Sequence, residues 1–148
     1  MKTVISYRYH GETIKNLEIL LVNVCSAFKF ADINPYCVYF EHYKNSRDRS
    51  PAEMMQLAFS HIDNSDFLFV IQASEARSEG MLIEIGYAIA RGVKVVIATK
   101  KGISNTYLPS MGDYAFEYVD IQDLIQRIKE INFTPLIQGH NSGEACIV

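Results

Sequence analysis

The chain has 148 residues, of which 49% are hydrophobic and 21% charged, and its formal net charge is −3. This length and composition are typical of one globular domain and exclude a disordered or fibrous chain. Because the Lys and Arg residues are dispersed, we expect no polymeric nucleic acid as a partner. No apolar stretch approaches the ~20 residues that span a bilayer, so we expect no membrane association either.

Three cysteines, Cys25, Cys37 and Cys146, are widely spaced and form neither a CxxC pair nor a disulfide framework. The apolar run near the N-terminus is too short for a signal peptide. These features predict a protein of the reducing cytoplasm. We expect neither a bound metal nor a cofactor.

The first part of the chain is predicted to hold a strand, a helix and a second strand. Residues 4–7 are a short apolar run that ends in polar residues, as expected of a buried strand that leads into a loop. From Thr13 onward, apolar residues recur at helical spacing. Asn34-Pro35 breaks this pattern, so we place the second strand at residues 37–40 and a polar loop at 43–49.

The middle of the chain carries clear helix and strand signals. Ser50-Pro51-Ala52-Glu53 is a capping box with proline at the first helical position, which predicts a helix start. The run 67–71 is apolar without alternation, as in a strand buried on both faces. We predict a helix over 81–91 that Gly92 ends, followed by a buried strand over 93–98.

The last elements are a strand over 114–118 and a helix that begins at Asp120. Strands that alternate with helices require a parallel sheet with right-handed crossovers. The predicted fold class is α/β, a three-layer α/β/α sandwich around a five-stranded parallel sheet that is flavodoxin-like or Rossmann-like. We expect one domain over 1–133 and a flexible tail over 134–148.

Ligands of open parallel sheets bind beyond the carboxyl ends of the strands, so the loops at that edge are the place to search for chemistry. The most informative segment is 78–88, because it places Glu84 in the first turns of an otherwise apolar helix. One interpretation is a solvated acid, or one paired with Arg91 or Lys94. The other is a carboxylate that faces a ligand pocket.

These residues resemble the nucleoside 2-deoxyribosyltransferase superfamily and are most similar to its 2′-deoxynucleoside 5′-monophosphate N-hydrolases. The resemblance spans about residues 1–130. It rests on four motifs in the same order: Ser6-x-Arg8-x-x-Gly11-Glu12, Glu41-His42, Ser78-x-Gly80 followed by Glu84-Ile85-Gly86-Tyr87-Ala88, and Leu108-Pro109-Ser110-Met111.

The resemblance implies an N-glycosidic bond hydrolase or base transferase in which Glu84 attacks C1′ and displaces the base. Tyr7 or Tyr9 would orient the nucleophile or the sugar, and the sequence leaves open which of them does so. The transferases usually carry an aspartate at the position of Ser78, which favours a nucleoside 5′-monophosphate here. The substrate-binding residues would be Ser6, Arg8, Gly11, His42, Ser78, Gly80 and Ser110.

By the same resemblance, Ser110 would reach the phosphate of a neighbouring subunit, so we expect a homodimer with its sites near the interface. One position departs from the family. The aspartate expected on the second helix is replaced by Ala58, and Glu53 or His61 are the candidates to replace it. This departure keeps two alternatives open: a TIR-like NAD hydrolase or cyclase, and a nucleotide-binding protein without activity.

Overall fold

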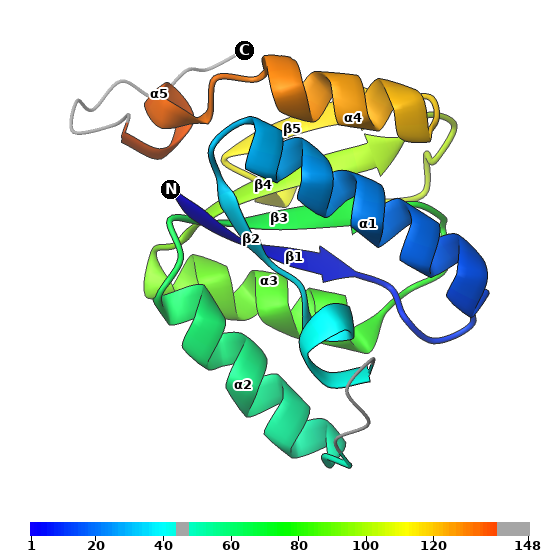
Figure 1. Ribbon diagram of the computed structural model, residues 1–148, viewed down its shortest axis with the longest axis vertical. Coiled ribbons are helices and arrows are strands. Elements are labelled where there is room, and N and C mark those ends of the chain that lie inside the picture. The colour runs from blue at the N-terminus through cyan, green and yellow to red at the C-terminus, as the bar shows by residue number, and fades with distance from the viewer. Residues whose placement is uncertain (44–47, 139–148) are drawn as a thin grey trace.

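The computed structural model describes residues 1–43 and 48–138, without the side chains of residues 42 and 43. Parallel strands alternate with helices through the described part of the chain (Figure 1). The elements are β1 Lys2–Tyr7, α1 Ile14–Phe30, β2 Asn34–Tyr36, α2 Pro51–Asp63, β3 Phe67–Gln72, α3 Glu79–Arg91, β4 Lys94–Lys100, β5 Tyr114–Tyr118, α4 Ile121–Glu130 and α5 Phe133–Gln138.

The sheet has five strands in the order β2-β1-β3-β4-β5, and every pair is parallel. Helices α1 and α4 cover one face and helices α2 and α3 the other (Figure 1). The predicted α/β sandwich with a flavodoxin-like sheet is therefore confirmed. Strands β2 and β3 lie on opposite sides of β1, so the strand order reverses at β1. Ligands of such sheets bind at the carboxyl ends of the strands beside this reversal.

Each face of the sheet packs its own apolar core. Ile5 of β1 lies in the core under α1 and α4, whereas its neighbour Val4 lies in the core under α2 and α3. Alternating strand residues point to opposite faces, so Ser6 is on the side of Val4 and Tyr7 is on the side of Ile5. Strand β3 is buried along its whole length, which explains its unalternated apolar sequence.

Helix ends agree closely with the sequence signals. Ser50 and Glu53 form the predicted capping box at the start of α2. Gly92 ends α3 with a φ of 70°, a left-handed conformation that glycine adopts without steric cost. Helix α3 begins at Glu79, two residues before the predicted start, because the Ser78 hydroxyl accepts a hydrogen bond from the Met81 amide and caps the helix.

The predicted second strand over 37–40 is wrong. Strand β2 is Asn34–Tyr36, and a π-helical turn spans Tyr39–Tyr43. Pro35 is tolerated because β2 is an edge strand that pairs only with β1. The segment that contains Cys37 and Tyr39 is apolar in sequence because these side chains pack into the core under α1. It does not pair in the sheet. In the predicted loop at 43–49, residues 44–47 lie outside the described residues.

The predicted tail from Thr134 is also wrong for its first residues, which form helix α5. Phe133 anchors this helix because its ring is buried and stacks on Phe67 with 5.0 Å between the ring centroids. Residues 139–148 lie outside the described part of the chain. In the described part, no helix is both long and apolar enough to cross a bilayer.

Candidate active site

Glu84 lies in the second turn of α3 and turns toward the end of β1. The Ser6 hydroxyl donates a hydrogen bond to Glu84 Oε2 across 2.5 Å. Ser6 is only 1% exposed and faces α3 because the alternation of β1 puts it on the side of Val4. Strand β1 and helix α3 therefore join at one short hydrogen bond at the reversal point of the sheet.

Burial raises the pKa of Glu84 to about 7, and the hydrogen bond from Ser6 acts in the opposite direction. The two cations that the sequence suggested as partners of Glu84 form ion pairs with other acids. Arg91 Nε lies 2.8 Å from Asp63 Oδ1, and Lys94 Nζ lies 2.7 Å from Asp113 Oδ1. The interpretation of Glu84 as a surface acid paired with Arg91 or Lys94 is therefore wrong.

Glu84 lines a cavity of about 760 Å³ on the α2 and α3 side of the sheet edge. Tyr7, Arg8, Ser78 and Gly80 line it too, so the structure brings five of the proposed site residues together. Helix α2 contributes an apolar wall that includes Met55. A volume of this size is typical of pockets for nucleotide-sized ligands.

The cavity lining carries several arginines, which the sequence only partly revealed. Arg49 and Arg77 line it together with Arg8, and Glu79 is an acidic member of the same lining. We did not single out Arg49 and Arg77 from the sequence, although Arg77 stands immediately before the capping Ser78. Because the first amides of a helix have no helical acceptor, the start of α3 adds hydrogen-bond donors to these charges. The arrangement suits an anion.

Ser78 and Gly80 lie where an anion can approach the start of α3. The Ser78 oxygen accepts from the Met81 amide at 3.3 Å, which leaves its own hydroxyl proton available to donate. A Cβ added at Gly80 would lie 3.8 Å from Met55 Cε, an ordinary van der Waals contact, so the backbone there is not crowded. Ser78 thus caps the helix, and its hydroxyl proton remains free to be donated toward the cavity.

Gly11 and Arg8 belong to one structural unit in the loop after β1. Arg8 Nη1 pairs with Glu12 Oε1 at 2.8 Å, and the Arg8 side chain is 26% exposed. Gly11 has a φ of 83°, and a Cβ there would lie 2.5 Å from Arg8 Nη2. Gly11 therefore makes room for the arginine, and it is not among the described residues that line the cavity.

Two of the remaining proposed residues, Tyr9 and Ser110, are not among the described residues that line the Glu84 cavity. Tyr9 packs against the core under α1, and its ring meets His10 edge-on at 5.6 Å. Ser110 lies in a short 3₁₀ helix, Leu108–Met111, where its hydroxyl donates to the Tyr107 carbonyl at 2.6 Å. His42 lies in the π-helical turn, and its side chain is outside the described residues.

The second helix supplies no acid to this cavity. Ala58 is buried in the core, at 2% exposure. The Glu53 carboxylate accepts from the Ser50 amide at 2.7 Å, and the His61 ring stacks on Tyr36 with 3.4 Å between centroids. Neither proposed replacement therefore lines the described cavity. Among the described residues, no group of three or more His, Cys, Asp or Glu side chains could hold a metal ion.

No protein-family model matches the chain, and no curated protein matches it in sequence. Solved structures do match. A CMP N-glycosidase of Clostridium botulinum, BcmB, is 14% identical, with a TM-score of 0.66 over 86% of this chain and 97% of that one. A 2-deoxyribosyltransferase of Bacillus psychrosaccharolyticus is 13% identical, with a TM-score of 0.67 over 92% and 96%.

The solution structure of BlsM is similar as well, with 16% identity and a TM-score of 0.71 over 92% of this chain and 88% of that one. Each of these matches extends over most of both aligned chains. The chain therefore has the fold of the nucleoside deoxyribosyltransferase-like proteins.

Proposed function

We propose that this protein is an N-glycosidase of nucleoside 5′-monophosphates, with Glu84 as the nucleophile. The observation that carries the proposal is the Glu84 carboxylate, which accepts a hydrogen bond from Ser6 and whose pKa burial raises to about 7, in a cavity that three arginines also line. Perturbed acids in clefts are candidates for catalysis. The similarity in fold to a CMP N-glycosidase supports the same class of reaction.

In the proposed reaction, a Glu84 carboxylate oxygen attacks C1′ of the sugar. The C1′–N bond breaks, its electron pair leaves with the base, and a glycosyl ester forms on Glu84 through an oxocarbenium-like state. A water molecule then attacks C1′, loses a proton and releases the sugar phosphate, while the Glu84 carboxylate is restored. A second base in place of water would make the protein a transferase.

The cationic part of the cavity is proposed to hold the 5′-phosphate. Arg77, the Ser78 hydroxyl and the amides at the start of α3 are donors that could converge on phosphate oxygens. Gly80 would allow the phosphate to come close to the helix, since it has no side chain and lines the cavity. Tyr7 lines the same cavity and is the better candidate of the two tyrosines to orient the sugar.

We also propose that the protein is a homodimer in which Ser110 completes the partner's phosphate site. Exposed apolar residues on α3 and next to Ser110 support a contact surface here: Leu82, Ile83, Ile89 and Met111. Burying such residues is the main driving force for association. Analytical ultracentrifugation is expected to show a dimer, and a monomer at micromolar concentration would contradict this part of the proposal.

A second candidate function is NAD hydrolysis of the TIR-like kind. The observation in its favour is that, among the described residues, α2 contributes no acid to the lining of the Glu84 cavity. Nicotinamide leaves NAD as a neutral molecule, so its release needs no acid to supply a proton. The same absence would slow the release of an ordinary base from a monophosphate.

The decisive experiment incubates the protein with ribo- and deoxynucleoside 5′-monophosphates, with the matching nucleosides and with NAD, and measures free base by chromatography. We expect base release from a monophosphate, with the Glu84→Gln variant slower by roughly a thousandfold or more. Glu75→Gln, which changes an exposed acid outside the described cavity, is the matched control. Nicotinamide release would favour the second function. Binding of nucleotides without any base release would leave a binding protein.

A further inference from the structure

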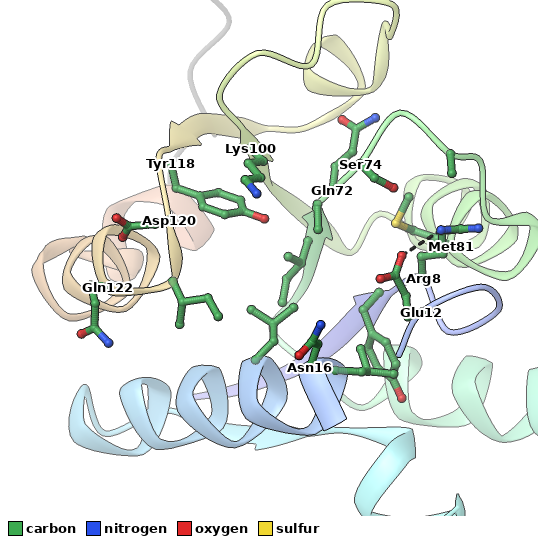
Figure 2. Close-up of a pocket in the computed structure, with 17 residues that line it drawn as sticks. Arg8, Glu12, Asn16, Gln72, Ser74, Met81, Lys100, Tyr118, Asp120 and Gln122 are labelled. Atoms are coloured by element: carbon green, nitrogen blue, oxygen red, sulfur yellow. Dashed lines mark hydrogen bonds and ion pairs between the residues drawn. The ribbon is translucent and has the colours of Figure 1, made fainter. Parts of the chain in front are cut away.

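A second cavity, of about 620 Å³, opens on the other face of the same sheet edge. It lies between α1 and α4, at the ends of β3, β4 and β5 (Figure 2). Leu17, Leu20 and Ile71 supply aliphatic walls, and Tyr118 supplies an aromatic one. The proposed reaction uses none of these four side chains.

Tyr118 is the unusual residue of this cavity. It is 3% exposed, and none of the described residues forms a hydrogen bond with its hydroxyl. Figure 2 shows the hydroxyl pointing into the cavity rather than into the core. A buried polar group without a partner is costly, and native structures rarely keep one without a purpose. Burial raises the pKa of Tyr118 to about 12, so the hydroxyl keeps its proton and can donate it.

A second donor points into the same space. Lys100, at the end of β4, lines the cavity, and Figure 2 shows its ammonium group directed inward on the same side as the Tyr118 hydroxyl. Two donors above aliphatic walls suit a flat ligand that presents an oxygen acceptor at its edge. A ring carbonyl has this chemistry, and it would satisfy the Tyr118 hydroxyl.

We propose that this cavity is a second ligand site, for an oxo-substituted heteroaromatic ring such as a nucleobase that carries a carbonyl group. The ring lies between the aliphatic walls, and its carbonyl oxygen accepts from Tyr118 and Lys100. The site goes beyond the proposed reaction, since it contains neither Glu84 nor Ser78.

The two cavities share Tyr7 and Arg8 as lining residues. The ion pair of Arg8 with Glu12 stands at the edge of the second cavity, where Figure 2 draws it as a dashed line. The loop after β1 therefore borders both cavities.

The test is calorimetric titration of the full-length protein with uracil and with hypoxanthine, which contain ring carbonyls but no glycosidic bond. We expect binding to the unmodified protein, an affinity about tenfold lower for Tyr118→Phe, and a loss of severalfold for Lys100→Gln. Tyr114→Phe, on the same strand but outside the cavity lining, is the matched control and is expected to bind normally. Glu84→Gln should also bind normally, because it changes only the other cavity.

Failure to bind either base, equal affinity of Tyr118→Phe and the unmodified protein, or loss of binding in Glu84→Gln would overturn the proposal. Thermal unfolding controls for folding, because removal of a buried hydroxyl that no described residue bonds should leave the melting temperature of Tyr118→Phe equal to or above that of the unmodified protein. Since no turnover is measured, the result is independent of whether the protein releases bases from monophosphates.

Discussion

The two cavities at the carboxyl edge of the sheet differ in the polar and charged groups that line them. The cavity on the α2 and α3 side holds an acid whose pKa burial raises to about 7, beside arginines at the start of a helix. The cavity on the α1 and α4 side is walled by aliphatic and aromatic groups and presents the Tyr118 hydroxyl. Both lie at the carboxyl edge of one sheet, and Tyr7 at the end of β1 lines both of them.

The difference follows from the alternation of β1 and from what covers each face. Ser6 points toward α3, whose second turn supplies Glu84, so polar chemistry gathers on that side. Tyr7 points toward the core under α1, where long apolar side chains fill the layer. A single strand can therefore supply a reactive site on one face and a binding surface on the other.

The largest difference between the two cavities is expected in kcat/KM when Arg77, which lines only the Glu84 cavity, loses its charge. Arg77→Gln should lower kcat/KM for a nucleoside 5′-monophosphate by roughly a hundredfold, because charge-assisted hydrogen bonds to phosphate are strong. Turnover of the matching nucleoside should change little. Steady-state kinetics on both substrates measure this, with Arg127→Gln on the distant α4 as control. Equal losses on both substrates would contradict a phosphate contact.

The next effect concerns stability. An acid whose pKa is higher in the folded protein than in the unfolded chain favours folding while it is protonated. For Glu84, this contribution is fully present below pH 4.5 and is lost as the pH rises through about 7. Glu84→Gln should therefore raise the free energy of unfolding at pH 8 by about 2 to 3 kcal/mol relative to the unmodified protein, and by little at pH 4.

Urea unfolding at the two pH values measures this difference. Tyr118→Phe is the comparison from the other cavity, and it should show no such dependence between pH 4 and pH 8, because the Tyr118 pKa lies near 12. A Glu84→Gln variant that is equally stabilised at both pH values would show that Glu84 does not titrate as described.

A smaller effect is expected from Ser6. Its hydroxyl lowers the pKa of Glu84, so Ser6→Ala should raise that pKa further. The acid limb of the pH profile of kcat/KM should move to higher pH, and the rate at pH 6.5 should fall several-fold, by roughly what one charge-assisted hydrogen bond provides. Ser65→Ala, far from the cavity, is the control. An unmoved profile would show that ionisation of Glu84 does not limit the rate.

The smallest effect comes from two glycines of α3. Gly80→Ala and Gly86→Ala should each stabilise the helix by about 0.5 to 1 kcal/mol, since neither added methyl group would meet a close neighbour. Only the methyl at Gly80 enters the charged cavity, so only Gly80→Ala should raise KM for the monophosphate, by a few-fold. Thermal unfolding and kinetics on the same samples check both statements, and equal KM values would contradict the site.

Local sequence signals predicted the helix caps and the buried strands because these depend on neighbouring residues. The capping box at Ser50 and the glycine cap at Gly92 are contained within a few residues of chain. The second strand failed for the opposite reason. The apolar run that begins at Cys37 owes its composition to tertiary burial under α1, and a short run cannot distinguish burial in a core from pairing in a sheet.

The sequence by itself determined the alternating α/β order, the parallel sheet and the position of Glu84 at the start of a helix beside its carboxyl edge, because periodicity and capping act over short distances. Only the tertiary structure decided that Ser6 bonds Glu84 across 78 positions of sequence, that Arg49 and Arg77 join Arg8, and that the Tyr118 hydroxyl faces a second cavity. These relations depend on which segments the fold brings together in space. Local residue patterns do not encode contacts between segments that lie far apart in the sequence.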